Sequence, residues 1–239
     1  MNMHSIFELS HAPVYFEAHM AVQNDIFLDY QTVPLEQTDQ AVTVRENIAA
    51  FALEASRNML PVYVKTNLNG IAELPGLYVQ KGQLVESSWR KWEWAYWFVA
   101  QHPELQHVAI VDSGSVRLVN DPFEHLDPNL LYVADQLQSV ADLPVQTELP
   151  VEMQQRLRQI LQQQALSSAL VVGDRSVVFE FLSLVMQLKY QTDGTLPFDQ
   201  IVFNDLIHRY FAARTIHGRL VSTIWGFNQL DSSAWFKCD

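Results

Sequence analysis

The feature that most constrains this chain is a short apolar run that ends on a carboxylate. The segment 108–111 reads Val-Ala-Ile-Val, and Asp112 follows it directly. A run this short and rich in β-branched residues is typical of a strand covered on both faces, as in a parallel sheet with helices on each side. Ligands of open α/β sheets bind at the carboxyl ends of the strands. Asp112 is therefore a candidate ligand-contacting residue.

Length and composition favour one compact domain over residues 1–239. The chain has 239 residues, of which 49% are hydrophobic, so it can bury a substantial core. It carries 15 Lys and Arg against 27 Asp and Glu, a formal charge of −12. This balance argues against nucleic acid or an anionic membrane surface as a partner. A phosphate-bearing small ligand would need a local cluster of cations.

Cysteine usage and the first residues bear on location. Cys238 is the only cysteine, which excludes a disulfide framework and a thiolate metal cluster. The first 20 residues lack the basic and apolar regions of a signal peptide, and no apolar run reaches the roughly 18 residues that a transmembrane segment needs. We therefore expect a cytoplasmic protein without a transmembrane segment. The sequence does not indicate its oligomeric state.

Hydrophobic periodicity predicts alternating strands and helices. Strands are expected at 14–20, 61–67, 77–79, 108–111, 129–134, 166–173 and 220–227, and a strand or extended connector at 26–33. Helices are expected at 45–59, 151–165, 175–190 with Asp174 as cap, 198–214, and from a cap at Ser87 or Ser88 onward. This order predicts an α/β fold, a Rossmann-like α/β/α sandwich with a mostly parallel central sheet.

The helix after Ser88 is unusually aromatic. Trp89, Trp92 and Tyr96 share one face at helical spacing, and further aromatic residues extend the apolar surface around the helix. Such density usually indicates core packing. The alternative is that one ring stacks on a nucleobase or a sugar.

Four short stretches of the chain form three recognisable patterns. The first pattern has two parts, 101–105 (Gln-His-Pro-Glu-Leu) before the central strand and 120–124 (Asn-Asp-Pro-Phe-Glu) after it. The second is 166–173, and the third is 199–204, which reads Asp-Gln, three apolar residues and Asn. Together, over roughly residues 88–204, these patterns resemble the glycosyltransferases of the GT-A fold, a family with many bacterial and plant members. In the second pattern, Ser167 stands where the family has Asn and Ala169 where it has Gly.

This resemblance implies a single GT-A-like domain that transfers a sugar from a nucleoside diphosphate sugar to a saccharide or other acceptor. It implies that Asp199 is the catalytic residue and that Ser167, Ser168 and Gln200 contact the sugar or the acceptor. The implied donor-binding residues are Arg90, Lys91, Asp112, Ser113, Gly114 and Ser115. Lys65 and Asn67 are further candidates for donor binding, because they lie at the carboxyl end of a predicted strand.

The resemblance also implies a divalent metal, Mn²⁺ or Mg²⁺, held by Asp112. Family members carry a second carboxylate two or three residues later, but this chain has Gly114 and Ser115 at those positions. A metal here would depend on Asp112, hydroxyl or carbonyl oxygens and the diphosphate. His208 and His217 lie late in the chain, where some members supply a metal-binding histidine.

The residues themselves leave simpler alternatives open. Lys65 and Asn67 at a strand end can be ordinary turn residues, and Arg90 and Lys91 can form a solvated helix end. Asp199 at a helix N-terminus favours the helix dipole regardless of any ligand.

Alternatives remain for the function as well. The chain lacks the GxGxxG, P-loop, HExxH, GxSxG and CxxC motifs, which argues against their chemistries. The main alternative to a glycosyltransferase is a catalytically inactive protein of the same fold that binds or scaffolds. A third is an unrelated α/β enzyme acting on a small phosphorylated substrate, with a pocket away from Asp112.

Overall fold

The computed structural model describes residues 24–34, 37–84, 87–145, 148–224 and 233–238, and these contain a central sheet of seven strands. The strand order is β3-β2-β1-β4-β7-β6-β8. The strands are β1 (Asp25–Gln31), β2 (Val62–Thr66), β3 (Leu77–Lys81), β4 (His107–Val111), β6 (Leu131–Ser139), β7 (Gln164–Asp174) and β8 (Thr215–Ile216). Strands β1 to β4 are parallel, β7 is antiparallel to both of its neighbours, and β8 is parallel to β6. The predicted α/β fold with a mostly parallel sheet is confirmed.

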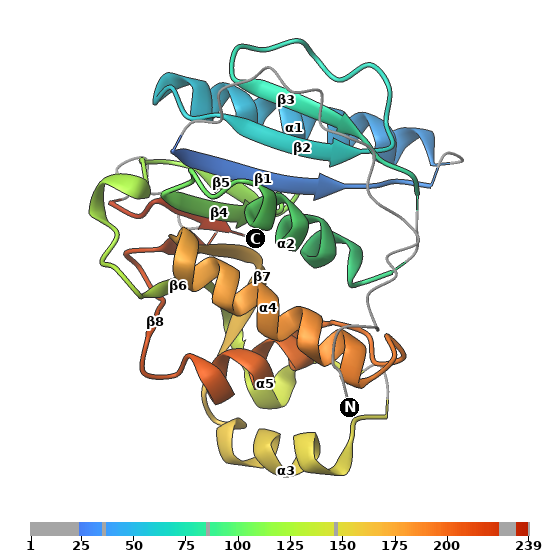
Figure 1. Ribbon diagram of the computed structural model, residues 1–239, viewed down its shortest axis with the longest axis vertical. Coiled ribbons are helices and arrows are strands. Elements are labelled where there is room, and N and C mark those ends of the chain that lie inside the picture. Colours follow the sequence, from blue (N-terminus) through green and yellow to red (C-terminus); the bar gives the residue numbers. More distant parts are fainter. Residues whose placement is uncertain (1–23, 35–36, 85–86, 146–147, 225–232, 239) are drawn as a thin grey trace, which may run out of the picture.

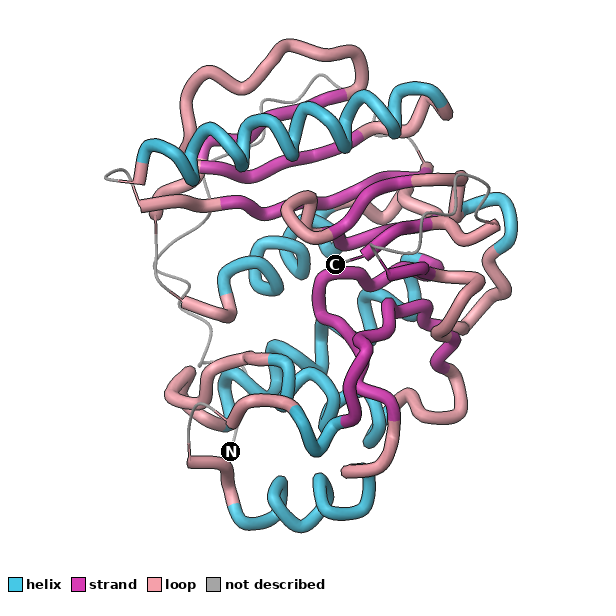
Figure 2. Tube along the Cα trace, turned by 180° about the vertical axis from the view of Figure 1, so that it is seen from behind, coloured by secondary structure: helices cyan, strands magenta, loops and turns pink. Residues whose placement is uncertain are grey.

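Helices and a small sheet cover the two faces of the central sheet (Figures 1 and 2). The helices are α1 (Thr38–Arg57), α2 (Arg90–Gln101), α3 (Val151–Ile160), α4 (Arg175–Gln191) and α5 (Gln200–Tyr210). Helices α2, α4 and α5 pack on one face. Helix α1 packs on the other face together with a sheet of β5 (Val116–Leu118), β10 (Phe236–Cys238) and β9 (Ser222–Ile224). Two short 3-10 helices, η1 (Phe123–His125) and η2 (Val140–Asp142), complete the described elements.

The central strands feed both cores because their side chains alternate between the two faces. In β1, Ile26 and Leu28 join the core under α2 and α4, whereas Phe27 joins the core under α1. All three are fully buried. Burying a side chain of this size contributes about 1.5–3 kcal/mol. The sheet is thereby fixed between its two layers, and the ends of its strands remain as the places where polar groups reach the surface.

The aromatic helix α2 belongs to the core, as its composition predicts. Trp89, Trp92 and Trp94 are at most 8% exposed. Trp92 packs against Phe181 and Phe203, with ring centroids 5.4 and 6.2 Å away. The interpretation of this helix as core is confirmed for these three tryptophans.

Helix boundaries are where the sequence misleads most. Helix α1 begins at Thr38, within a polar stretch of no clear period, and periodicity misses this start because Thr38, Asp39 and Gln40 are all exposed. The expected helix 151–165 is wrong at its end, since α3 stops at Ile160 and Ala165 lies in β7. An apolar residue at position 165 is compatible with both helical and strand periodicity. This part of the chain forms a strand because it pairs with β6.

Of the two predicted caps, that of α2 is wrong and that of α4 is correct in position. Trp89, not a serine, occupies the N-cap position of α2, and the Ser88 hydroxyl instead accepts a hydrogen bond from the Phe198 amide at 2.8 Å. Asp174 does stand at the N-cap of α4, but its side chain makes no capping bond. The caps differ because tertiary partners compete for these side chains.

The remaining differences concern the ends of the chain. The helix expected at 198–214 is shorter, and the strand expected at 220–227 is seen as β9 as far as Ile224. Strand β10 has no counterpart in the sequence prediction. The strand expected at 14–20 lies outside the described residues. Among the residues that the structure describes, no helix has the length and apolar character needed to cross a membrane.

Candidate functional site

The candidate site lies where strand order reverses, between β1 and β4. From β1 the chain continues through β2 to β3 on one side of β1, and it then crosses to the other side to form β4. The loops that follow the carboxyl ends of these two strands therefore run to opposite sides. Ligands of such sheets usually bind between two loops of this kind. Asp29 and Gln31 lie at the end of β1, and Asp112 follows β4.

Gln31 joins the two carboxylates at this position. Its side-chain nitrogen Nε2 donates to Asp29 Oδ1 at 2.9 Å and to Asp112 Oδ1 at 2.7 Å. Asp29 is only 1% exposed, whereas Asp112 is half-buried and accessible to solvent. One neutral amide thus holds together two acidic groups from different strands.

The Asp29 carboxyl group is strongly perturbed. Its burial, followed by the nearby negative charge of Asp112, raises its pKa from 3.8 to about 6. The nearby polar side chain of Ser113, the hydrogen bond from Gln31 and the charge of Lys91 lower the pKa, but they do not offset the burial. A buried carboxylate with a shifted pKa at a strand end is a frequent feature of functional sites.

Lys91, in the first turn of α2, faces the same two carboxylates. Burial lowers its pKa, and the charges of Asp112 and Asp29 oppose this change. Its Nζ donates to the Ser168 carbonyl at 3.2 Å and lies 5.0 Å from the centre of the Trp92 ring. The structure therefore brings Lys91 together with Asp112, two of the residues that the sequence singled out.

The loop after β4 folds back on Asp112. The Gly114 amide donates to Asp112 Oδ1 at 3.0 Å, and the Ser115 amide donates to the Asp112 carbonyl at 2.9 Å. A Cβ atom at Gly114 would lie 3.1 Å from Asp112 Oδ1, so a larger residue would press on the carboxylate. Ser113 is 2% exposed, and its hydroxyl oxygen has no hydrogen-bond partner among the described residues.

The second resembling stretch lies beside this loop, on an irregular part of β7. The pairing of β6 with β7 shifts register between Val133 and Ala134, whose partners are Val171 and Ser167. Residues 168–170 bulge out of the ladder with β6, and the Ala169 carbonyl accepts a hydrogen bond from the Asp112 amide at 2.8 Å. Such bulges often re-aim side chains next to active sites. Here the bulge places Ser168 against Lys91.

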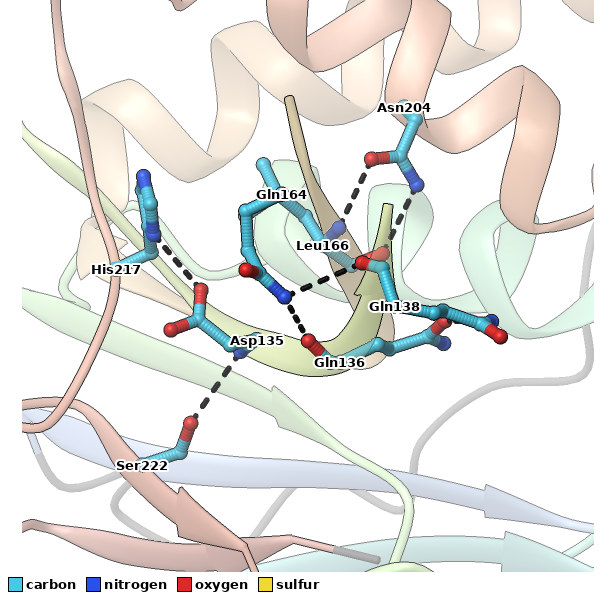
Figure 3. Close-up of polar contacts among 8 residues, drawn as sticks. All are labelled: Asp135, Gln136, Gln138, Gln164, Leu166, Asn204, His217 and Ser222. Atoms are coloured by element: carbon cyan, nitrogen blue, oxygen red, sulfur yellow. Dashed lines mark hydrogen bonds and ion pairs between the residues drawn. The ribbon is translucent and has the colours of Figure 1, made fainter. Parts of the chain in front are cut away.

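Gln200 and Asn204 in α5 hold this bulge in place. The Gln200 side chain accepts from the Ser168 amide at 3.1 Å and donates to the Ser168 hydroxyl at 2.9 Å. Asn204 is fully buried and bonds both the amide and the carbonyl of Leu166, each at 2.9 Å. Figure 3 shows Asn204 reaching across to Leu166. The Ser167 hydroxyl accepts from the Ala169 amide at 3.3 Å.

Asp199 has a clear structural role. It is the N-cap of α5, and its Oδ1 accepts hydrogen bonds from the Ile201 and Val202 amides, both at 3.1 Å. Its other oxygen, Oδ2, is buried and has no hydrogen-bond partner among the described residues. The bonds to Oδ1 explain the position of the carboxylate, and they leave Oδ2 unexplained.

The three other predicted donor contacts lie farther along the same edge. Lys65 is half-buried, and its pKa is lowered first by burial and then by the charge of Arg90. Arg90 is 44% exposed and pairs with Glu93 at 3.1 Å. Asn67 bonds both backbone groups of Val33, at 3.0 and 2.7 Å, which braces the segment after β1. Lys65 and Arg90 thus form a small cationic group, and Asn67 stabilises a loop.

Asp29 and Gln31 are the site residues that sequence reasoning missed. The signal was weak but present, because two polar residues interrupt the end of a strand whose preceding residues are apolar. Nothing in the local sequence indicates that β1 and β4 are neighbours. Only the strand order reveals that Asp29 and Asp112 meet.

The oxygen atoms of Asp29, Asp112 and Ser113 are suited to bind a hard cation that takes its remaining ligands from water or substrate. Among the described residues, no group of three or more His, Cys, Asp and Glu side chains could hold a metal. Two carboxylates nevertheless converge, and the unpartnered hydroxyl of Ser113 is buried beside them. Mg²⁺ and Mn²⁺ sites of one or two carboxylates are completed by water and substrate phosphates. The residues present therefore fit such a metal.

His217, one of the late histidines, lies elsewhere. Its Nδ1 is 2.7 Å from Asp135 Oδ1 on β6, and the Asp135 amide donates to the Ser222 hydroxyl at 3.4 Å (Figure 3). Burial, followed by the nearby charge of His217, lowers the pKa of His208, and the charge of Asp205 opposes this change. Strand β7 lies between β6 and β4, which places these two strands about 10 Å apart at the usual spacing. Neither histidine contacts Asp112 through a described bond.

Two cavities lie away from these residues. An apolar one of about 340 Å³ lies beside α3 and η2, and a polar one of about 440 Å³ is lined by Asp121, Glu124 and His125. Comparisons with known proteins add no assignment to either place. No protein-family model matches the chain, and a search of curated proteins finds no match.

Proposed function

We propose that this protein is a glycosyltransferase of the GT-A type, which binds a nucleoside diphosphate sugar between β1 and β4 and transfers the sugar to a saccharide or other acceptor. The observation that supports this most is the convergence of Asp29, Asp112, Lys91 and the Ser168–Gln200 pair at the point where strand order reverses. Polar groups from five segments of the chain meet there.

The distribution of cations supports a phosphate-bearing ligand. The chain as a whole is acidic, yet Lys65, Arg90 and Lys91 gather at the carboxyl edge of β1, β2 and β4. Two of them, Lys65 and Arg90, are close enough for one to lower the pKa of the other. An anion bound between such groups relieves their mutual repulsion. This is the local exception that a phosphate ligand requires in a chain of net charge −12.

These residues suggest a division of roles. In sugar transfer, the oxygen of an acceptor hydroxyl bonds to the anomeric carbon while the bond from that carbon to the diphosphate breaks. The diphosphate leaves with the electron pair and takes up the proton that the hydroxyl loses. Lys91, Arg90 and Lys65 would stabilise the charge that develops on the diphosphate. Ser168 and Gln200 offer hydroxyl and amide groups suited to sugar hydroxyls. Asp199 would act chiefly by fixing the start of α5, and with it Gln200.

A divalent cation, when bound at Asp112, would add charge neutralisation at the leaving diphosphate. The resemblance to GT-A enzymes implies Mn²⁺ or Mg²⁺. The rival proposal is a catalytically inactive protein of the same architecture, which Gly114 and Ser115 favour because they stand where the family has a second carboxylate. The two proposals differ in whether a nucleotide binds and whether its sugar is transferred.

Calorimetric titration of uridine and guanosine diphosphates, with and without Mn²⁺, tests the proposal. We expect one nucleotide to bind per chain. In Lys91→Met the nucleotide should bind about tenfold more weakly, since a charge-assisted contact of about 1.4 kcal/mol is lost. Lys189→Met is the matched control, because Lys189 is also partly buried and pairs with Glu93 on the same layer. Absence of binding by any nucleotide would contradict the transferase and favour the rival.

A further inference from the structure

We propose that Asp29, from β1, supplies the second carboxylate of a divalent-cation site whose first carboxylate is Asp112. The two residues are far apart in the sequence, and their side chains meet through Gln31. The site would take Mn²⁺ or Mg²⁺ together with water and phosphate oxygens. Its role in sugar transfer rests on the proposed function, whereas the cation site itself does not.

The geometry of the carboxylates is the first argument. Asp29 Oδ1 and Asp112 Oδ1 both lie within hydrogen-bond distance of one nitrogen atom, Gln31 Nε2. Two carboxylate oxygens that approach the same small donor are also positioned to approach one cation. A hard cation favours such oxygens over all other protein ligands.

Ser113 provides an independent argument. Its side chain is only 2% exposed, faces the Asp29 carboxylate, and has an oxygen without a hydrogen-bond partner among the described residues. A buried hydroxyl without a partner carries a free-energy cost, because it has lost its hydrogen bonds to water. Coordination of a cation by this oxygen, or by water bonded to it, would remove that cost.

Lys91 does not take the place of the cation. Its ammonium group donates to the Ser168 carbonyl, and no salt bridge from Lys91 to either carboxylate occurs in the described part of the chain. Its charge acts on Asp29 and Asp112 from a longer distance. Lys91 is thus placed to meet a phosphate oxygen while the carboxylates hold the metal.

Gln31 can serve both states of the site. Its amide now presents nitrogen to the two carboxylates, and rotation by half a turn would present the carbonyl oxygen instead. The nitrogen suits carboxylates without a metal, because it bridges two negative groups. The oxygen suits the same carboxylates with a metal between them, because it adds a ligand. The sequence Asp-Tyr-Gln at 29–31 therefore completes what the segment 112–115 lacks.

Binding of Mn²⁺ alone, followed by electron paramagnetic resonance of the unbound ion, tests this proposal without nucleotide or turnover. We expect one site per chain in the wild type. Asp29→Asn and Asp112→Asn should each weaken binding about tenfold or more, because each removes a ligand charge. The double variant should bind little more weakly than either single variant, since both residues hold one ion.

Asp135→Asn is the matched control. Asp135 is also an aspartate on a strand of the central sheet, its side chain is 21% exposed, and it is engaged by a neighbouring side chain, His217 (Figure 3). Equal weakening in this variant would show that the acidic surface binds Mn²⁺ diffusely and would overturn the proposal. Unchanged binding in Asp29→Asn, with a folded protein by circular dichroism, would overturn it as well. If Asp29→Asn fails to fold, Ser113→Ala replaces it in the test. This variant removes only the hydroxyl and should weaken Mn²⁺ binding about threefold or more.

The same titration separates this proposal from the proposed function. If Mn²⁺ binding depends on Asp29 and neither uridine nor guanosine diphosphate binds or changes it, the result would support the cation site and contradict the transferase. Nucleotide bound by a chain that binds no Mn²⁺ at this site would support the transferase and overturn the cation site.

Discussion

The carboxylates at the amino ends of β1 and β4 have different partners from those at the carboxyl ends of the same strands. At the amino ends, Asp25 lies 2.7 Å from His107 Nδ1, and Asp174 lies 3.4 Å from the other ring nitrogen of the same histidine. At the carboxyl ends, Asp29 and Asp112 share the neutral amide of Gln31 and accept hydrogen bonds from backbone N–H groups. The amino end holds its titratable partner, His107, within hydrogen-bond distance, whereas the cation at the carboxyl end, Lys91, acts on the carboxylates by its charge from a longer distance.

This difference distinguishes polar groups that stabilise the sheet from polar groups that are suited to bind a ligand. The histidine stands between its acidic neighbours on adjacent strands, so the group is complete within the sheet. At the other end, burial and the charge of Asp112 raise the pKa of Asp29, which shows that ionisation there is resisted. A cluster in which ionisation is resisted gains more from an added cation than one that already has its partner.

The largest expected effect is at the amino edge, where Gly173→Ala should lower the free energy of unfolding by about 3 kcal/mol. An added Cβ would lie 2.9 Å from the Leu130 carbonyl and 2.7 Å from the Val177 side chain, and the carbonyl belongs to backbone that cannot easily shift. Urea unfolding followed by circular dichroism measures this. A loss below about 0.5 kcal/mol would show that this edge is looser than its contacts indicate.

Asp29→Asn should stabilise the metal-free protein at pH 8 by about 2 kcal/mol, and the gain should vanish at pH 4. The Asp29 carboxyl group has a pKa of 3.8 in an unfolded chain and of about 6 in the folded one. The folded state therefore binds the extra proton between these values, and wild-type stability falls as the pH rises through them. A tenfold difference in acidity between the two states corresponds to about 1.4 kcal/mol, so the gain has an upper limit of about 3 kcal/mol.

Urea unfolding in EDTA at pH 4, 6 and 8 measures the difference between the two proteins. A constant difference at all three pH values would contradict the raised pKa of Asp29. Added Mn²⁺ should reduce or reverse the advantage of the variant, because only the wild type retains both carboxylates.

Asp25→Asn, at the opposite end of the same strand, should change stability by less than about 1 kcal/mol, and only as a loss. Its side chain is 35% exposed, and partly exposed ion pairs contribute little. The same unfolding series measures it. A stabilisation at pH 8 as large as that of Asp29→Asn would erase the contrast between the two ends.

Gly114→Ala should have the smallest effect on stability, within about 0.5 kcal/mol, since Gly114 is exposed. It should still weaken Mn²⁺ and nucleotide binding about threefold, because its Cβ would press on Asp112 Oδ1. Calorimetry compares the two ligands in wild type and variant. Unchanged binding would mean that the Asp112 carboxylate is not held where the ligands need it.

Periodicity predicts most strands of this protein and fewer of its helix ends. The apolar run before Asp112 indicates β4 correctly, because a strand buried on both faces has few sequence alternatives. The end of α3 cannot be obtained in this way, since Ala165 satisfies helical and strand periods alike and its partners on β6 are distant in the sequence. The antiparallel direction of β7 likewise follows from pairing and not from its composition.

The candidate site divides along the same line. Asp112, Lys91, Ser168 and Gln200 were indicated by strand ends and resembling stretches, and the structure brings them together. Asp29 and Gln31 were not, because their importance comes from a neighbour far along the chain. Asn67 and Asp199 were indicated as contacts, and their hydrogen bonds show that each has a structural role of its own.

The amino-acid sequence alone determines that this chain is an α/β protein, with an acidic surface and a carboxylate at the end of its most apolar strand. These properties depend on local periodicity and composition, which neighbouring residues define. Tertiary structure alone decides that β1 lies beside β4 and that Asp29 meets Asp112. Strand order is set by how the helices cover both faces of the sheet, and that packing acts between residues that the sequence keeps far apart.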